Sequence, residues 1–247
     1  DPATNGLCLV VVSVSSDGFY VTDVGLPAGS YNSAFAFNFS QPEDLEVGDV
    51  LRSFGGGVEE FIGFTELDFP HFTVKEPGRA DLLPAPAPLD TALLADNAGM
   101  EAYEASLVTV TGVYTPDEFR DCDLNDDGTV EICFFFSNCV PGSNEDLEDQ
   151  CAFDCQNTPG CSDRTAYLTF GQYAVTLSAG GGKANVVSST ALPQFDPTAS
   201  CAPGTYTGCS VLLDRVIGTV RQVTPARPRW VVEPRFPEDM CFTGTGC

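Results

Sequence analysis

Helical periodicity is almost absent from this sequence, and short runs rich in Val, Phe, Tyr and Thr take its place. Gly and Pro, which account for 24 and 18 of the 247 residues, separate these runs. Short β-branched and aromatic runs between turn-forming residues are typical of β-strands, whereas a helix needs a longer stretch with apolar residues three and four positions apart. The chain is therefore predicted to be all-β.

Residues 1–74 form the first predicted domain, an OB-like barrel. Its five predicted strands span residues 7–14, 17–23, 33–39, 48–61 and 63–69, and residues 41–47 are predicted to form one helical turn. Gly55, Gly56 and Gly57 interrupt the fourth strand, and glycines inside a strand mark a bulge or a sharp bend. Five strands with such a bend fit a small closed barrel.

Residues 75–100 change in character, since four Pro interrupt them, and they are predicted to be an extended linker with a short helix near 90–95. A second OB-like barrel is predicted over residues 101–247. Its strands are expected at 105–114, 165–170, 173–177, 210–223 and 229–235, with insertions at 116–164 and 178–209. Because the strand order repeats that of the first domain, we expect two tandem barrels, the second with a large, acidic, disulfide-rich insertion.

Eleven cysteines accompany a single histidine and no CxxC pair, which favours disulfides in an oxidising compartment over zinc sites. The disulfide candidates are Cys122, Cys133, Cys139, Cys151, Cys155, Cys161, Cys201, Cys209, Cys241 and Cys247. Cys122 is expected to pair either with Cys133 or elsewhere among the six cysteines of 122–161. Cys201–Cys209 and Cys241–Cys247 are the other expected pairs. Cys8 is then the unpaired residue and the candidate for a bond between chains.

The stretch "DCDLNDDGTVEICFFFSNC" (121–139) contains the first half of a calcium loop. Asp123, Asn125 and Asp127 precede Gly128 at the alternate spacing that brings oxygen ligands to one hard cation. Asp121, the Thr129 carbonyl and Glu131 are further candidate ligands. Phe134 occupies the position of the last glutamate of an EF-hand loop, so a shortened loop is expected. The alternative is a solvated acidic turn without a metal.

The formal net charge is −24, which repels phosphate groups and argues against nucleic acid as a partner. Arg221, Arg229 and Trp230 nevertheless form a possible ligand groove, because basic and aromatic side chains together suit single strands or acidic glycans. The alternative is that the arginines of 215–235 pair with the acidic residues of 117–163. The apolar run 132–136 is predicted to be a buried strand or, alternatively, an exposed surface for a protein partner.

Several segments resemble the OB-fold accessory modules of secreted bacterial nucleases of the endonuclease/exonuclease/phosphatase family. The resemblance covers "DGFYVTD", "VGDVLRSFGGGVEEFIGFTEL", "NAGMEAYEASLVTVTGV" and "IGTVRQVTPARPRWVVEPRFPEDM", about two thirds of the chain. It implies the accessory fold, a bacterial source and secretion. Nothing in the chain resembles the nuclease domain, whose chemistry needs His and Asp or Asn clusters around a metal, whereas His71 is the single histidine here.

The sequence therefore predicts a non-catalytic binding or structural protein, secreted or on the cell surface, stabilised by Ca²⁺ and engaged in protein assembly or self-assembly. One histidine supports no Ser–His–Asp or Cys–His arrangement, so no enzyme activity is expected. No apolar run approaches the 18 residues of a membrane span. The alternative function is a nucleic-acid-binding accessory module of a secreted nuclease system.

Overall fold

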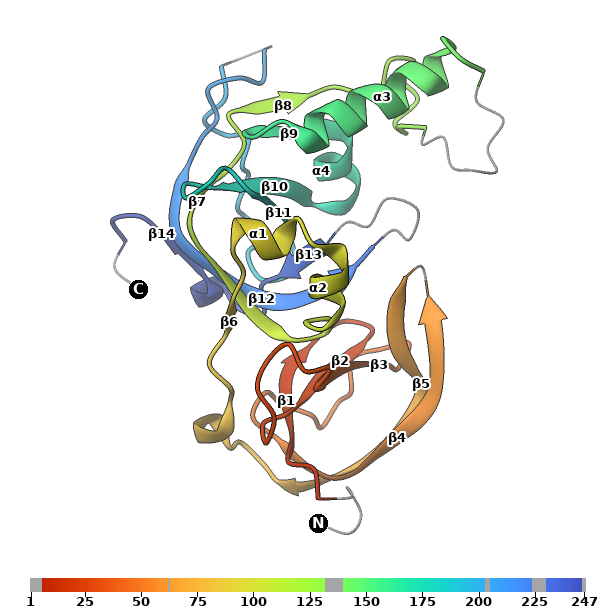
Figure 1. Ribbon diagram of the computed structural model, residues 1–247, viewed down its shortest axis with the longest axis vertical. Helices are drawn as coiled ribbons and strands as arrows, with labels where there is room; N and C mark the ends of the chain where they lie inside the picture. Colours follow the sequence, from red (N-terminus) through yellow and green to blue (C-terminus); the bar gives the residue numbers. More distant parts are fainter. Residues whose placement is uncertain (1–5, 62, 132–139, 203–204, 224–229, 246–247) are drawn as a thin grey trace. The chain divides into compact units, whose positions relative to one another are not determined.

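A computed structural model describes the chain except residues 1–5, 62, 132–139, 203–204, 224–229 and 246–247 (Figure 1). The chain divides into two compact units: unit 1 comprises Asp1–Thr109 and Ile217–Arg235, and unit 2 comprises Val110–Val216 and Phe236–Cys247. This division differs from the predicted domain bounds at residues 74 and 100. The reason is that two strands, β7 (Leu107–Tyr114) and β12 (Leu212–Gln222), each run from one unit into the other.

The first five strands close into a barrel, as the sequence predicted, and we call it barrel 1. Its strands are β1 (Leu9–Val14), β2 (Gly18–Asp23), β3 (Ser33–Phe37), β4 (Val50–Phe61) and β5 (Phe64–Glu76), in the order β1-β2-β3-β5-β4. All neighbouring pairs are antiparallel except β3 and β5, which run parallel. A five-stranded closed barrel with these connections matches the predicted OB-like architecture.

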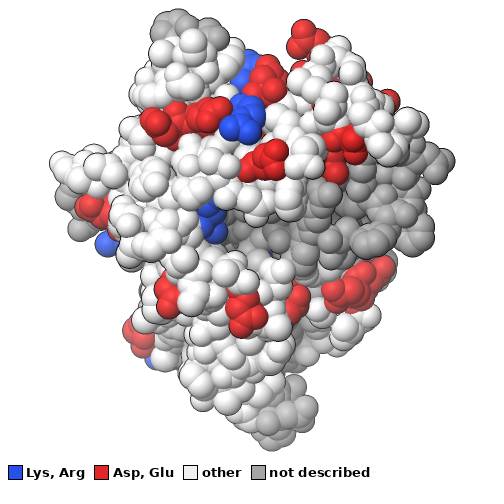
Figure 2. Space-filling model, turned by 45° about the horizontal axis from the view of Figure 1, so that its top comes forward, with Lys and Arg blue, Asp and Glu red and all other residues white. Residues whose placement is uncertain are grey.

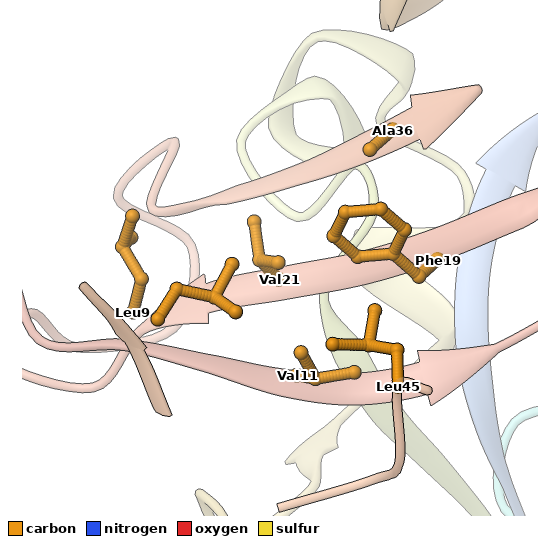
Figure 3. Close-up of a cluster of buried hydrophobic side chains, with 7 residues drawn as sticks. Leu9, Val11, Phe19, Val21, Ala36 and Leu45 are labelled. Atoms are coloured by element: carbon orange, nitrogen blue, oxygen red, sulfur yellow. The ribbon is translucent and has the colours of Figure 1, made fainter. Parts of the chain in front are cut away.

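The interior of barrel 1 is filled by alternate residues of its strands, because successive side chains of a strand point to opposite faces. The buried cluster consists of Leu9, Val11, Phe19, Val21, Ala36, Leu45 and Leu51 (Figure 3). Complete burial of such side chains contributes about 1.5–3 kcal/mol each. The predicted helical turn at 41–47 does not form; this segment makes turns that bring Leu45 into the cluster.

Short elements follow barrel 1 in unit 1: η2 (Ala80–Leu82), β6 (Ala87–Pro88), α1 (Thr91–Leu94) and α2 (Asn97–Glu101). The carboxylate of Asp90 accepts a hydrogen bond from the Leu93 amide at 2.8 Å and so caps α1. The short helix predicted near residues 90–95 is confirmed.

The second barrel is formed by β7, β10 (Gln172–Leu177), β11 (Lys183–Val187), β13 (Trp230–Glu233) and β12, in that order, closed by the pairing of β12 with β7. This order is the same as in barrel 1, so β12 corresponds to β4 and β13 to β5, as the repeat in the sequence suggested. Two further strands extend the sheet: β6 pairs with β7, and β14 (Met240–Phe242) pairs with β12 after the turn η3 (Pro237–Asp239).

The insertion at 116–164 contains β8 (Glu118–Arg120), the helix α3 (Asn144–Asn157) and β9 (Cys161–Asp163), with β8 and β9 paired in parallel. Lys183 anchors the end of α3, because its ammonium group donates to the carbonyl oxygens of Cys155, Thr158 and Cys161 at 2.6–3.1 Å. A cation at this end of a helix offsets the negative end of the helix dipole.

Residues 165–170 were predicted to be a strand paired with 173–177, and this prediction is wrong. They lie in the helix α4 (Arg164–Phe170), and β10 pairs with β11 instead, so the segment 178–209, predicted to be an insertion, contains a strand of the barrel. The carboxylate of Asp163 accepts a hydrogen bond from the Thr165 amide at 2.9 Å, and Gly171 adopts a positive φ of 64° after the last turn. These two signals, an N-cap and a C-terminal glycine, outweigh the strand preference of Tyr, Thr and Phe.

Three disulfides join described residues: Cys122–Cys151, Cys155–Cys161 and Cys201–Cys209. The prediction for Cys201 and Cys209 is confirmed, whereas the bridge from Cys122 to Cys133 is not formed, because Cys122 reaches α3 instead. Cys241 is also disulfide-bonded, and Cys8 is free. Cys133, Cys139, Cys247 and the apolar run 132–136 lie outside the described residues. The three bridges indicate an oxidising compartment.

Within the described part of the chain, no helix combines the length and the apolar character that crossing a bilayer requires.

Candidate functional site

A pocket of about 470 Å³ lies in unit 1, beside strands β3, β5 and β4 of barrel 1. We call it the barrel-1 pocket. It is lined by Asp17, Phe35, Phe37, Glu59, Phe61, Phe64, Glu66, Asp68, Arg221, Gln222 and Val223. Asp17 belongs to the loop between β1 and β2, and residues 59–68 belong to the β4–β5 hairpin. In OB folds these loops and the face beside them bind ligands.

Strand register places the pocket side chains on one face. Glu66 of β5 lies between Phe35 of β3 and Glu59 of β4. Two residues further along β5, Asp68 lies between Phe37 and Gly57. Residues two apart in a strand share a face, so both rows point toward the pocket, away from the cluster inside the barrel.

The glycine run of β4 allows the two long strands to approach closely beside the pocket. A Cβ atom on Gly56 would lie 2.7 Å from the carbonyl oxygen of Asp68, which is shorter than any side chain tolerates. The register of β4 and β5 shifts between Gly55 and Gly57, as expected for the bulge that the sequence predicted. The bulge therefore fixes where Asp68 meets β4.

Four carboxylates, those of Asp17, Glu59, Glu66 and Asp68, line the pocket together with one guanidinium group. Burial raises the pKa of Glu66, and the neighbouring Asp68 raises it further. Hydrogen bonding with Asp68, and repulsion from it, raise the pKa of Glu59. Acidic side chains are also spread widely over the face of the molecule drawn in Figure 2, where basic ones are sparse. The pocket therefore gathers four of the many acidic side chains of the chain in one place.

The guanidinium of Arg221 is engaged at the edge of the pocket. It forms an ion pair of 2.7 Å with Glu233, whose other oxygen accepts a hydrogen bond from the Tyr20 hydroxyl at 3.2 Å. Burial raises the pKa of Glu233, although Arg221 and Tyr20 stabilise its charged form. Arg221 was expected either to line a groove or to pair with residues 117–163; it lines the pocket and pairs with Glu233.

The other two residues of the predicted groove do not join Arg221. Trp230 is buried, and its indole nitrogen donates to the side-chain oxygen of Asn97 at 3.2 Å. Arg229 lies outside the described residues. The aromatic side chains of the pocket come from barrel 1 instead, where Phe35 packs 5.5 Å from Phe64 and 4.7 Å from Tyr20 between ring centroids.

A chain of phenylalanine rings leads from the pocket to the surface. Phe37, in the pocket lining, lies 4.5 Å from Phe39, and Phe39 lies 5.5 Å from Phe69, measured between ring centroids. Phe39 and Phe69 are exposed, as is Phe61 on the hairpin. Exposed aromatic side chains beside a pocket are the typical composition of a contact surface.

The predicted calcium loop folds as a tight turn in unit 2. The two carboxylate oxygens of Asp123 accept hydrogen bonds from the amides of Asp127 and Gly128 at 3.2 and 2.8 Å, and the side-chain oxygen of Asn125 accepts from the Asp127 amide at 3.0 Å. Asp127 accepts from the amide of Thr129 at 2.9 Å. Asp121 instead forms an ion pair with Arg164 at 3.2 Å.

Glu148 of α3 holds both ends of this turn. Its buried carboxylate accepts hydrogen bonds from the amides of Leu124 and Glu131 at 3.0 and 3.3 Å. Hydrogen bonding with Glu148 raises the pKa of Glu131, and one carboxylate oxygen of Glu131 is buried without a hydrogen-bond partner. The sequence reasoning did not include Glu148, which lies far along the chain from the motif.

The donor chemistry of the turn fits a hard cation, since it offers carboxylate, amide and carbonyl oxygens. Among the described residues, however, no three His, Cys, Asp or Glu side chains are grouped so that they could hold a metal ion. The carboxylates of the turn point to backbone amides. Calcium therefore remains a prediction for Asp123, Asn125, Asp127, Thr129 and Glu131.

Sequence reasoning also missed the carboxylates of the barrel-1 pocket. A signal was present in "EEFIGFTELD", where Glu59, Phe61, Phe64, Glu66 and Asp68 are spaced so that, in a hairpin, they share one face. Charged residues at alternate positions beside aromatic ones would normally be assigned to solvent, so the parallel pairing with β3 was needed to recognise the pocket.

Comparison with family models, with curated proteins and with solved structures finds no match for this chain.

Proposed function

We propose that this chain is a non-catalytic binding protein of an external, oxidising compartment, and that it takes part in assembly by receiving a protein partner at the barrel-1 pocket. The observation that carries the proposal is the position of the pocket at the loops and strand face that OB folds use for ligands. Its size lies within the range of about 300–1,000 Å³ that is typical of ligand pockets.

Two further observations support a protein partner. Phe39, Phe61 and Phe69 are exposed around the pocket, and aromatic side chains are enriched in protein interfaces. The three disulfides suit a protein that has to persist outside the cell. In this proposal Ca²⁺ stabilises the turn of Asp123, Asn125 and Asp127, with the Thr129 carbonyl and Glu131 as further ligands.

Photo-crosslinking tests the proposal. Phe61 is replaced by a photoreactive phenylalanine analogue, and the protein is irradiated in the medium of the cells that produce it. The matched control carries the analogue at Val58, which is on the same strand and also exposed but is not part of the pocket lining. We expect position 61 to crosslink one defined protein, or a second copy of the chain, and position 58 not to do so.

The crosslinked protein is then purified and its affinity measured directly. Phe61→Asp should weaken its binding, because an exposed apolar contact is replaced by a charge, and Val58→Asp should not. Absence of any crosslink at position 61, or equal crosslinking at both positions, contradicts the proposal.

A further inference from the structure

The charges of the barrel-1 pocket are not balanced by the protein. Asp17, Glu59, Glu66 and Asp68 contribute four carboxylates, and Arg221 contributes the one guanidinium among the lining residues. Arg221 is already paired with Glu233 at 2.7 Å, and one guanidinium does not offset four carboxylates. The pocket therefore holds a surplus of negative charge in a partly desolvated place.

Glu66 shows this surplus most clearly. It is 7% exposed, it lines the pocket, and its carboxylate makes no hydrogen bond or ion pair with any described residue. Glu59 lies directly opposite it across β4 and β5, and like charges at such positions destabilise a sheet. Buried carboxylates are normally paired or hydrogen-bonded, so an unpaired one facing a cavity indicates that its partner comes from outside.

The aromatic side chains restrict what that partner is. Phe35, Phe37, Phe61 and Phe64 line the same cavity, and the π face of an aromatic ring attracts cations. A hard metal ion needs six or more oxygen ligands around one point, and among the described residues no three carboxylates are grouped so that they could hold one. A neutral sugar would leave the negative charge unbalanced, and a phosphate would add to it. An organic cation, with a charged end and an apolar stem, satisfies both the carboxylates and the rings.

We propose that the barrel-1 pocket binds the guanidinium or ammonium group of a basic side chain that a protein partner inserts. The identity of the partner as a protein rests on the proposed function, whereas the cationic chemistry rests on the pocket alone. The charged end contacts Glu66, Glu59 and Asp68, and the stem lies along the phenylalanine rings. The exposed rings of Phe39 and Phe69 contact the residues that flank the inserted side chain.

Short peptides with blocked ends test the proposal by calorimetry. One has a central arginine between glycines, and a second has citrulline, the neutral isostere, in its place. Lysine and norleucine form a second matched pair. We expect the two cationic peptides to bind and the two neutral peptides not to bind. Equal binding of arginine and citrulline would overturn the proposal.

Protein variants locate the binding. Glu66→Gln and Glu59→Gln should each weaken the binding of the arginine peptide by about tenfold or more, as expected for the loss of a hydrogen bond to a charged group. Phe64→Leu, which keeps the charge, should weaken it less. The control is Glu60→Gln, which makes the same charge change at the neighbouring residue but outside the pocket lining. Loss of binding in Glu60→Gln equal to that in Glu66→Gln would overturn the assignment to the pocket.

Agmatine and Ca²⁺ distinguish other sources of positive charge. Agmatine carries the guanidinium without the peptide and should bind more weakly than the arginine peptide. Tighter binding of agmatine would assign the pocket to a free organic cation and overturn the protein-borne side chain. Ca²⁺ is added at constant ionic strength as a competitor. If it displaces the peptide, the pocket binds a metal ion and the proposal of a basic side chain is wrong.

The cationic side chain and the protein partner can be tested separately. If the partner crosslinked at position 61 binds Glu66→Gln as well as the unmodified protein, the cationic side chain is wrong and the partner stands. If cationic peptides bind through Glu66 but position 61 crosslinks nothing, the pocket recognises a cation and the protein partner is wrong.

Discussion

Glu59 of β4 lies directly opposite Glu66 of β5, and no described residue forms an ion pair with either of them. Placing two carboxylates in register costs free energy of folding, so this pair weakens the unbound protein.

Glu66→Gln should therefore stabilise the free protein at pH 7, by about 1 kcal/mol, because it removes one of the two opposed charges. Thermal melts measure the effect. Glu60→Gln, at an exposed neighbour outside the pocket, should change the melting temperature little. A lower melting temperature for Glu66→Gln would contradict the prediction, because it would show that the charged carboxylate of Glu66 stabilises the folded protein.

Glu104 should make the protein less stable as the pH rises. Burial raises the pKa of this carboxyl to about 7. One of its oxygens accepts a hydrogen bond from the Thr65 amide at 3.2 Å, and the other is buried without a partner. Because the pKa in the folded state lies above that of the unfolded chain, the contribution is fully present below about pH 4.5. It is lost as the pH rises through about 7.

Glu104→Gln should remove this part of the pH dependence, so that the variant gains about 1 kcal/mol over the unmodified protein at pH 8, a figure reduced for the solvent screening of a half-buried group. Melts at pH 4.5 and pH 8 measure the gain, with Glu43→Gln on an exposed turn as the control. An equal difference between variant and unmodified protein at both pH values would contradict the assignment.

Calcium should raise the melting temperature of the protein relative to a chelator. At about 100 times its dissociation constant, a bound ion adds about 2.7 kcal/mol to stability. Asp127→Ala should erase the difference, whereas Asp126→Asn, a change at the next residue with the backbone preference retained, should not. Identical melts of the unmodified protein in both conditions would leave the solvated acidic turn as the correct interpretation.

The disulfide between Cys122 and Cys151 should account for a large part of the stability of the insertion. The two cysteines are 29 residues apart, and closing a loop of this length contributes about 3.6 kcal/mol. Replacing both by Ser should lower the free energy of unfolding of unit 2 by that amount in denaturant titrations. Cys8→Ser, which removes a free thiol, serves as the control. Equal midpoints for the double variant and the control would contradict the prediction.

Single-stranded DNA should not bind appreciably at roughly 0.15 M salt, where affinity depends on contacts between cations and phosphates. The net charge of −24 and the carboxylates of the pocket both oppose such contacts. Titration of labelled oligonucleotides by fluorescence anisotropy measures the affinity. Micromolar binding that is lost in Arg229→Ala would favour the nuclease-accessory alternative.

The two barrels were predictable because their strands are rich in β-branched and aromatic residues, and glycines mark the bend in β4. The second barrel was predictable only in part: β7, β10, β12 and β13 repeat the pattern of the first, whereas β11 lies in a segment predicted to be an insertion. Helix α4 was not predictable from composition, because Tyr167 and Phe170 favour strands and the helix depends on its two ends. The pairing of Cys122 with Cys151 could not be chosen either, since six clustered cysteines permit many connectivities.

The pocket was harder to predict than the fold, because it depends on a contact between strands that are distant in sequence. Phe35 and Glu66 meet through the parallel pairing of β3 and β5, and neither residue signals the other locally. The calcium motif shows the converse. Its spacing is clear in the sequence, yet Glu148, which fixes the turn, comes from a helix that no local pattern connects to it.

Neighbouring residues of β3 serve different tasks, since Ala36 belongs to the cluster inside barrel 1 while Phe35 and Phe37 line the pocket. Substitutions at the acidic pocket positions therefore need not disturb the interior, whereas Phe35 also packs with Tyr20 and Phe64 in a second buried cluster. A lineage of such chains could change what it recognises by altering residues 59, 66 and 68 alone. This separation makes barrel 1 a scaffold on which new specificities can evolve, or be selected in the laboratory, without refolding the protein.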